Sequence, residues 1–327
     1  MNIPLSTELN PFEGSIEKSA LNFGINTSPI YMGRYFPTSD KDANQPWVPT
    51  IIHNKECKDK KAISKLDDDG NITDWWIVGE KYHVKTHKNF FHPIHQALIK
   101  TIEPRYLKDV KITTQSSRNG RWGLQTYVFP NVTIPIETKQ GHNTDIQLRI
   151  TTWSGLDGCT ANNYIVGAFD GYCSNGLVFS RAIDTDAAYT RRYRRNTKGF
   201  NIDEFTADMK GAVDNFKVQS KEFQVYATTT LSYNAASKFI DSINSFSKSK
   251  REGMKALLDV EWYNRGPNIF SLHSALTRYS SDPDNPIIRT GKSKHKDSKH
   301  ELLHKREEEV TTILQSNSWK ELVAAHV

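Results

Sequence analysis

The stretch 145-DIQLRITTW-153 alternates between apolar and polar side chains. Ile146, Leu148 and Ile150 share one face of an extended strand, and the residues between them are polar. This period of two predicts a strand with one buried face and one face toward water. Strands of that kind are typical of antiparallel sheets, so the stretch favours an antiparallel architecture.

Turn signals on both sides of this strand predict a meander. Upstream, 110-VKITTQSSRNGRWGLQTYVF-129 contains Asn119-Gly120, a dipeptide that suits a type I′ hairpin turn. Downstream, 162-NNYIVGAFDGYCSNGLVFSRAI-183 contains Asp170-Gly171 and Asn175-Gly176, which predict a further reversal. We therefore expect four or more antiparallel strands in this region. A separate hairpin is expected around Asp69-Gly70, with Trp75 to Val78 in its second strand.

The spacing of apolar residues changes to three and four residues outside the meander. Residues 89–102 predict a helix with one buried face, in which Pro93 fits only the first turn. After the meander a long helix is expected, capped by Asn201, and a second helix is expected after Ser232. Residues 247–255 are expected to form a basic loop that passes into a short helix. The apolar stripe of the long helix consists of Ile202, Phe205, Met209, Val213 and Phe216.

These patterns predict an α+β fold, an antiparallel β-meander backed by a long helix, with further C-terminal helices. Residues 1–45 are interrupted by prolines and are expected to form an extended N-terminal arm. Residues 46–285 form the expected α+β core domain. Residues 286–327 are expected to be a charged, mobile tail with a short helix near 308–325. Because this tail has few apolar residues before Val310, cutting it at Thr290 is expected to leave the thermal stability nearly unchanged.

Composition favours a globular protein with an anionic partner. The 327 residues are 37% hydrophobic and 11% aromatic, with a formal net charge of +6. A basic balance of this kind often accompanies nucleic acid or an anionic membrane, although ordinary surface charge is the alternative. Three cysteines without CxxC spacing argue against a disulfide framework and fit a reducing, cytoplasmic setting. We expect no membrane partner, because no apolar run approaches the length of a transmembrane helix.

Familiar catalytic and cofactor motifs are missing. The sequence has no Walker A, GxGxxG, GxSxG or HExxH pattern, so we assign no catalytic residues and no cofactor. The histidines between His83 and His95 lack a cysteine or acid at ligand spacing, so no metal site is assigned. The protein is therefore expected not to be an enzyme. An enzyme with a scattered acidic site stays possible, and its first candidates are Asp170, Asp184 and Asp186.

The stretch 189-YTRRYRRNTKGF-200 concentrates positive charge without an acid. A solvated helix face usually interleaves acids with its basic residues, and this stretch does not. Arginine binds phosphate oxygens in pairs, and tyrosine rings stack on bases. We call this stretch, together with Arg181, the basic strip. Its predicted nucleic-acid contacts are Arg181, Tyr189, Arg191, Arg192, Tyr193, Arg194, Arg195 and Lys198. Pairing of the strip with acids elsewhere, or on a neighbouring subunit, is the alternative.

Arg118 and Arg121 flank the Asn119-Gly120 turn and are a second candidate contact. A basic hairpin tip can reach a groove or a single strand. For the adjacent Trp122, packing in the core is the preferred interpretation.

Two segments resemble a known family. FDGYCSNGLVFSR (169–181) and GPNIFSLHSALTRYSSD (266–282) resemble the phage/plasmid-like domain of unknown function 932 family, over roughly residues 70–285. That family name carries no activity, so no residue roles transfer. The predicted order of strands, basic connection and long helix is also similar to the single-strand annealing proteins of the Red-beta/RecT/Erf superfamily, which assemble into rings or filaments.

The resemblance implies a non-enzymatic protein that binds single-stranded DNA and promotes annealing in phage or mobile-element recombination. Such a protein is expected to be a homo-oligomer, a ring or a filament, in the cytoplasm, which is the host cytoplasm if a phage encodes it. The alternative is an anti-restriction or other host-interaction protein whose basic strip meets an acidic protein partner.

Overall fold

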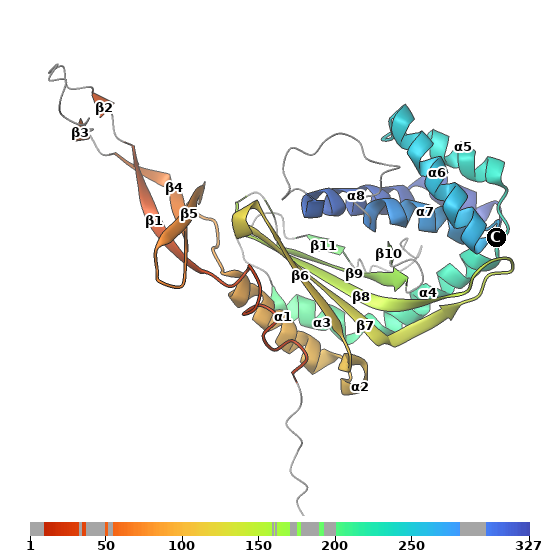
Figure 1. Ribbon diagram of the computed structural model, residues 1–327, viewed down its shortest axis with the longest axis horizontal. Coiled ribbons are helices and arrows are strands. Elements are labelled where there is room, and N and C mark those ends of the chain that lie inside the picture. Colours follow the sequence, from red (N-terminus) through yellow and green to blue (C-terminus); the bar gives the residue numbers. More distant parts are fainter. Residues whose placement is uncertain are drawn as a thin grey trace, which may run out of the picture.

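A central sheet lies between layers of helices, and a smaller sheet projects from this body (Figure 1). Helices and antiparallel sheets together confirm the predicted α+β class. This computed structural model describes residues 10–32, 35–36, 50–51, 55–158, 160, 162–170, 175–177, 190–192, 201–281 and 299–327.

The central sheet is the predicted meander, and all of its strand pairs are antiparallel. The spatial order is β10-β9-β8-β7-β6, and β11 pairs with the end of β9 that β10 leaves free. The strands are β6 (Lys111–Ser117), β7 (Trp122–Ile136), β8 (Thr144–Gly155), β9 (Asn163–Asp170), β10 (Asn175–Leu177) and β11 (Thr190–Arg192).

Both faces of this sheet are covered. The predicted apolar face of β8, with Ile146, Leu148 and Ile150, is buried in the main core with α1 (His87–Thr101), α3 (Ile202–Lys210) and α4 (Ala212–Thr228). On the opposite face, the guanidinium of Arg149 pairs with Glu307 of α8 (Lys299–Leu314). One face of β8 is thus buried by apolar contacts, and the other face is joined to α8 by an ion pair.

The C-terminal helices pack around α7 (Ile269–Ser281), which is buried along nearly its whole length. α6 (Lys248–Arg265) and α8 pack against it. The remaining helices are α5 (Tyr233–Ser242), which contacts α6 and α9 (Asn317–Ala324), and the single turn α2 (Pro104–Leu107), which contacts β7.

The projecting sheet has the order β1-β4-β5 (Figure 1). It consists of β1 (Gly24–Met32), β4 (Lys55–Leu66) and β5 (Ile72–Gly79), and β2 (Tyr35–Phe36) pairs with β3 (Thr50–Ile51) beyond it. The hairpin predicted around Asp69-Gly70 is confirmed, and Gly70 takes the left-handed conformation that the turn requires, with φ of 82°. The sheet is joined to the body where Trp76 Nε1 donates to the carbonyl of Leu156 and the Tyr82 hydroxyl donates to the carbonyl of Gly155.

Two predicted helices differ from the sequence pattern at their boundaries. α1 begins at His87, because the Thr86 hydroxyl accepts a hydrogen bond from the Asn89 amide at 3.0 Å. Pro93 therefore lies in the second turn, and the expectation that it occupies the first turn is wrong. Because proline has no N–H, the Asn89 carbonyl lacks the helical hydrogen bond that residue 93 would donate. Asn89 is exposed, so water can donate a hydrogen bond to this carbonyl instead.

The predicted long helix is two helices that meet at Gly211. This glycine is the C-cap of α3 and the N-cap of α4. The predicted cap at Asn201 is confirmed, because its side chain accepts from the amides of Asp203 and Glu204. Helix α5 begins after Ser232 as predicted, and the Ser232 hydroxyl accepts from the Ala235 amide.

The region expected to be a basic loop at 247–255 is the first half of α6. The Ser247 hydroxyl caps the helix by accepting from the Lys250 amide at 3.3 Å. The Lys250 amine lies 2.6 Å from the Glu309 carboxylate of α8, which offsets a positive charge at the positive end of a helix. The sequence pattern failed here because this compensating acid is 59 residues away.

Both ends of the described chain pack on the body, contrary to expectation. In the N-terminal segment, Phe12, Ile16 and Leu21 are buried in the main core, and the Phe12 ring stacks on His95 at 4.8 Å. The C-terminal segment forms α8 and α9, and it buries Val310, Ile313, Leu314 and Trp319 in the same core. The expectation of a tail without a packing role is therefore wrong for residues 299–327. Val310, Ile313 and Leu314 recur at helical spacing, so they face the body on one side of α8.

Candidate nucleic-acid interface

The basic strip is fixed to the central sheet at one point. The backbone of β11 pairs with β9, with Arg191 opposite Tyr164 and Arg192 opposite Asn163. The outer edge of β9 thus holds the backbone of Arg191 and Arg192 in a defined register. Several of the predicted contacts lie outside the described residues, namely Arg181, Tyr189, Tyr193, Arg194, Arg195 and Lys198.

The second candidate contact lies on the predicted turn between β6 and β7. Asn119 and Gly120 have φ of 57° and 88°, and the Arg121 amide donates to the Arg118 carbonyl at 3.1 Å. These are the features of the predicted type I′ turn. Glycine is required at position 120, because a Cβ there would lie 2.8 Å from the Phe23 ring.

Arg118 and Arg121 both have acidic partners within the chain. Arg118 pairs with Asp157, and Arg121 makes a two-pronged contact with Asp74 at 2.8 and 3.1 Å. The Arg121 guanidinium also lies over the Trp76 ring, 4.9 Å from its centroid. Both arginines therefore join the turn to neighbouring segments, and their role in nucleic-acid binding stays a prediction. Trp122 is buried, as expected.

The other arginines of the body are also engaged within the chain. Every arginine whose side chain the structure describes has an acidic or a carbonyl partner. The acidic pairs are Arg105–Glu103, Arg118–Asp157, Arg121–Asp74, Arg149–Glu307, Arg265–Asp170 and Arg278–Glu261, and the carbonyl contacts are Arg251 to Ile243 and Arg306 to Tyr279. Arginine in the described part of the chain thus serves structure, in contrast to the acid-free sequence of the basic strip.

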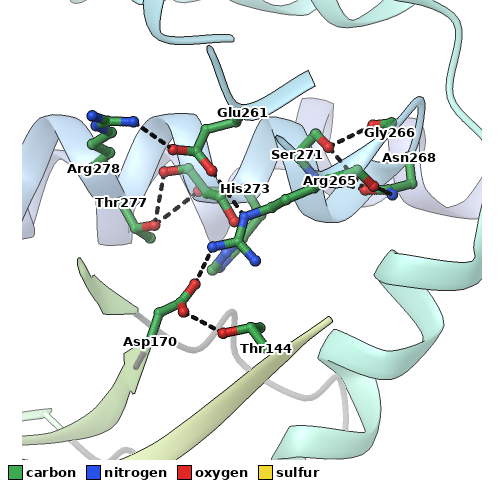
Figure 2. Close-up of polar contacts among 11 residues, drawn as sticks. Thr144, Asp170, Glu261, Arg265, Gly266, Asn268, Ser271, His273, Thr277 and Arg278 are labelled. Carbon is green, nitrogen blue, oxygen red and sulfur yellow. Dashed lines mark hydrogen bonds and ion pairs between the residues drawn. The ribbon is translucent and has the colours of Figure 1, made fainter. Parts of the chain in front are cut away.

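A buried charge cluster joins the end of β9 to the helical layer (Figure 2). Arg265 lies between Asp170 and Glu261, with its Nε 2.8 Å from Glu261, and all three residues are 0% exposed. Asp170 also accepts a hydrogen bond from Thr144, and the second oxygen of Glu261 accepts from Arg278 at 2.9 Å. Two carboxylates and two guanidiniums balance one another here, which offsets the cost of burying them.

This cluster bears on the enzymatic alternative. The carboxylate of Asp170 faces Thr144 and Arg265 inside the protein (Figure 2), so it is not placed to receive a substrate from solvent. The other two acids of that alternative, Asp184 and Asp186, lie outside the described residues.

The histidines of the 83–95 segment have separate hydrogen-bond partners, although the rings of His92 and His95 lie 6.1 Å apart. His87 is buried with its Nε2 2.5 Å from the Gly120 carbonyl, and burial lowers its pKa to about 4. His95 is buried with its Nε2 2.8 Å from Gln125, and burial likewise lowers its pKa to about 4. His92 is partly exposed and pairs with Glu17 at 3.0 Å. In the part of the chain that is described, no three His, Cys, Asp or Glu side chains are grouped to hold a metal ion.

Comparison of the chain with known proteins found no relative. No family model, no curated protein and no solved structure matches the chain. The resemblance to the domain of unknown function 932 family therefore stays a prediction. No helix among the described residues is both long enough and apolar enough to cross a membrane.

One surface was missed from the sequence. Trp75 and Ile77 alternate with the buried Trp76 and Val78 along β5, and they are 61% and 49% exposed. The sequence of β5 has large apolar side chains on both faces of the strand, which was the sign that one of these faces could be exposed. The sequence predicted the strand but not its exposed face, because alternation in an all-apolar run does not tell which face is buried.

Proposed function

We propose that this protein binds single-stranded DNA and promotes the annealing of complementary strands, without enzymatic activity. The observation that carries the proposal is the register of β11, which holds Arg191 and Arg192 against the outer edge of β9. Phosphate contacts are most effective when a rigid element positions them, and here that element is the central sheet. Arginine forks in the strip hold phosphates, and Tyr193 stacks on bases.

The proposal also draws on how charge is distributed. The arginines whose side chains are described pair with acids or donate hydrogen bonds to carbonyls within the chain. Residues 189–200, in contrast, contain four arginines, one lysine and no acid. A phosphate backbone supplies the anions that this segment lacks. Self-association into a ring or a filament then aligns many strips along one strand. Light scattering that found only a 37.3 kDa monomer, with and without DNA, would contradict this oligomeric part of the proposal.

The test is binding of a fluorescently labelled oligodeoxynucleotide at several salt concentrations. Replacing Arg191, Arg192, Arg194 and Arg195 by alanine removes four phosphate contacts. The slope of log affinity against log salt is expected to flatten by about 0.7 per arginine, or roughly 3 in total. Tyr193→Ala is expected to weaken binding by about 1–3 kcal/mol with little change in slope.

A matched control removes the same charge from elsewhere on the surface. Four exposed lysines on α3, α4, α5 and α9 are replaced by alanine, which lowers the net charge by the same amount. These lysines are Lys210, Lys221, Lys238 and Lys320. Equal flattening in both variants would show that net charge alone is responsible. Absence of salt-dependent binding in the wild type would contradict the proposal and favour the acidic protein partner.

A further inference from the structure

The outer face of β5 carries a cluster of exposed apolar side chains. Ile72, Trp75 and Ile77 are 62%, 61% and 49% exposed, and all three belong to one strand. Their neighbours Trp76 and Val78 point to the opposite face, where they pack with Ile63, Tyr82 and Leu156. The projecting sheet is therefore held by its buried face and by the contact of Arg121 with Asp74, without a contribution from the exposed apolar side chains.

The strand register defines what shares the outer face. Trp75 lies opposite Ser64, Ile77 opposite Ala62, and Gly79 opposite Lys60. Because directly opposed residues point to the same side of a sheet, these three rows form one surface. It runs about 13 Å along the strand, at roughly 3.3 Å per residue. Gly79 leaves open space at its end, where an added Cβ would meet nothing within 4 Å.

Lysines gather at the Gly79 end of this surface. A hollow of about 480 Å³ at this end of β4 is lined by Lys58, Lys60, Lys61 and Glu80, together with Thr27, Ser28 and Pro29. Lys60, opposite Gly79, lies on the outer face, whereas Lys61, opposite Val78, lies on the other face. The Lys61 amine donates to the Glu80 carbonyl at 2.7 Å. Lys58 and Lys60 are exposed and form no ion pair with any described residue. The acidic turn 67–69 lies at the other end of β5 from Lys60.

The outer edge of β5 is closed to strand addition at its centre. Arg121 donates to the Trp75 carbonyl at 3.2 Å, and the Trp75 amide donates to the Asp74 carboxylate at 2.8 Å. The backbone groups that a further strand would need are therefore engaged at this position. The face of the sheet, by contrast, presents the Trp75 ring toward Lys60 at its Gly79 end.

We propose that this face, the Trp75 platform, is a second contact for single-stranded nucleic acid. A base stacks on the Trp75 ring, its neighbour lies over Ile77 and Gly79, and Lys58 and Lys60 hold the adjoining phosphates. Aromatic rings beside a positive groove are the usual means by which proteins bind single strands without sequence preference. This inference rests on the proposed function and adds a site that is separate from the basic strip.

The experiment measures binding of oligodeoxythymidylate to the full-length chain by anisotropy and by quenching of tryptophan fluorescence. Trp76, Trp122, Trp153 and Trp319 are buried and Trp262 is partly buried, whereas Trp47 lies outside the described residues. The Trp75→Phe variant therefore assigns the quenching signal. Trp75→Ala is expected to weaken binding roughly 5- to 150-fold, the range for loss of one stacked base. Trp75→Phe is expected to retain most of the affinity and to lose most of the quenching.

Two further variants locate the phosphates and control for apolar exposure. Replacing Lys58 and Lys60 by alanine is expected to flatten the salt slope by about 1.4, at 0.7 per lysine. Val218→Ala removes an exposed apolar side chain from α4, outside the platform, and is expected to leave affinity unchanged. Circular dichroism checks that each variant is folded.

The outcomes separate this inference from the proposed function. If the wild type binds no oligodeoxythymidylate at any salt concentration, the proposed function fails and the platform fails with it. If the wild type binds through the basic strip but Trp75→Ala binds with unchanged affinity, only the platform is overturned. Unchanged affinity together with a smaller assembly in light scattering would assign the face to a protein contact instead.

Discussion

Trp319 offers a sharp test of whether the C-terminal segment belongs to the core. Its side chain is 1% exposed and lies among residues of three other helices. The ring centroid is 5.4 Å from Phe239, 5.8 Å from Tyr226 and 6.2 Å from His273. The indole therefore joins α9 to α4, α5 and α7, and its removal leaves a cavity among all four.

The expected cost of Trp319→Ala is about 3–5 kcal/mol, the range for loss of a large buried aromatic side chain. With an unfolding entropy of roughly 2.1 cal/mol/K per residue, a chain of 327 residues has about 0.7 kcal/mol/K. The melting temperature is then expected to fall by about 4–7 °C if the chain unfolds as one unit. Thermal unfolding followed by circular dichroism measures this shift.

Lys320→Ala is the matched control, because Lys320 is the exposed neighbour on the same helix. Its effect is expected to stay within about 0.5 kcal/mol. Removing α8 and α9 together deletes Val310, Leu314 and Trp319 from the core, so the truncated chain is expected not to form the native structure. If Trp319→Ala melted with the wild type, the tail would be dispensable, and the assignment of these helices to the core would be refuted.

Two further predictions concern buried ionisable groups. Asp170→Asn leaves the buried Arg265 with one acid fewer and is expected to cost about 3–5 kcal/mol in thermal unfolding, whereas the exposed Asp214→Asn is expected to cost little. Stability is also expected to fall as the pH drops from about 6.5 to 4. The pKa values of His87 and His95 are near 4 in the folded protein, so below pH 6.5 the unfolded chain binds more protons than the native state. Each histidine lowers the free energy of unfolding by about 1.4 kcal/mol for each pH unit below 6.5 in this window. A urea midpoint of unfolding that does not change from pH 7 to 4.5 would contradict the prediction.

The local features of the fold could be predicted from the sequence. The alternation in β8 and the Asn119-Gly120 turn place the meander correctly, because each depends on neighbouring residues only. The cap at Asn201 and the start of a helix after Ser232 were predicted for the same reason. Neighbouring residues decide where a strand reverses or a helix begins, so these features can be predicted from the sequence.

Features that depend on distant partners could not be predicted. The Asp170–Arg265 pair joins residues 95 positions apart, and Lys250 finds its acid 59 positions away. The charged sequence around α8 favoured a free tail, although Val310 and Leu314 recur at helical spacing. The sequence predicted the basic strip as a candidate site but not its attachment to the sheet. Pairing of β11 with β9 depends on which part of the β9 edge β10 leaves unpaired.

The arrangement of β5 explains why its exposed tryptophan is informative. A single exposed apolar residue is common on protein surfaces and requires no explanation. Here the buried residues Trp76 and Val78 already anchor the projecting sheet, so the ring of Trp75 adds nothing to that core. The edge of the strand is engaged by Arg121, which leaves the face as the surface available to a partner. A planar ring on that face, with lysines at one end and acids at the other, fits a ligand that has flat apolar bases and a negative backbone.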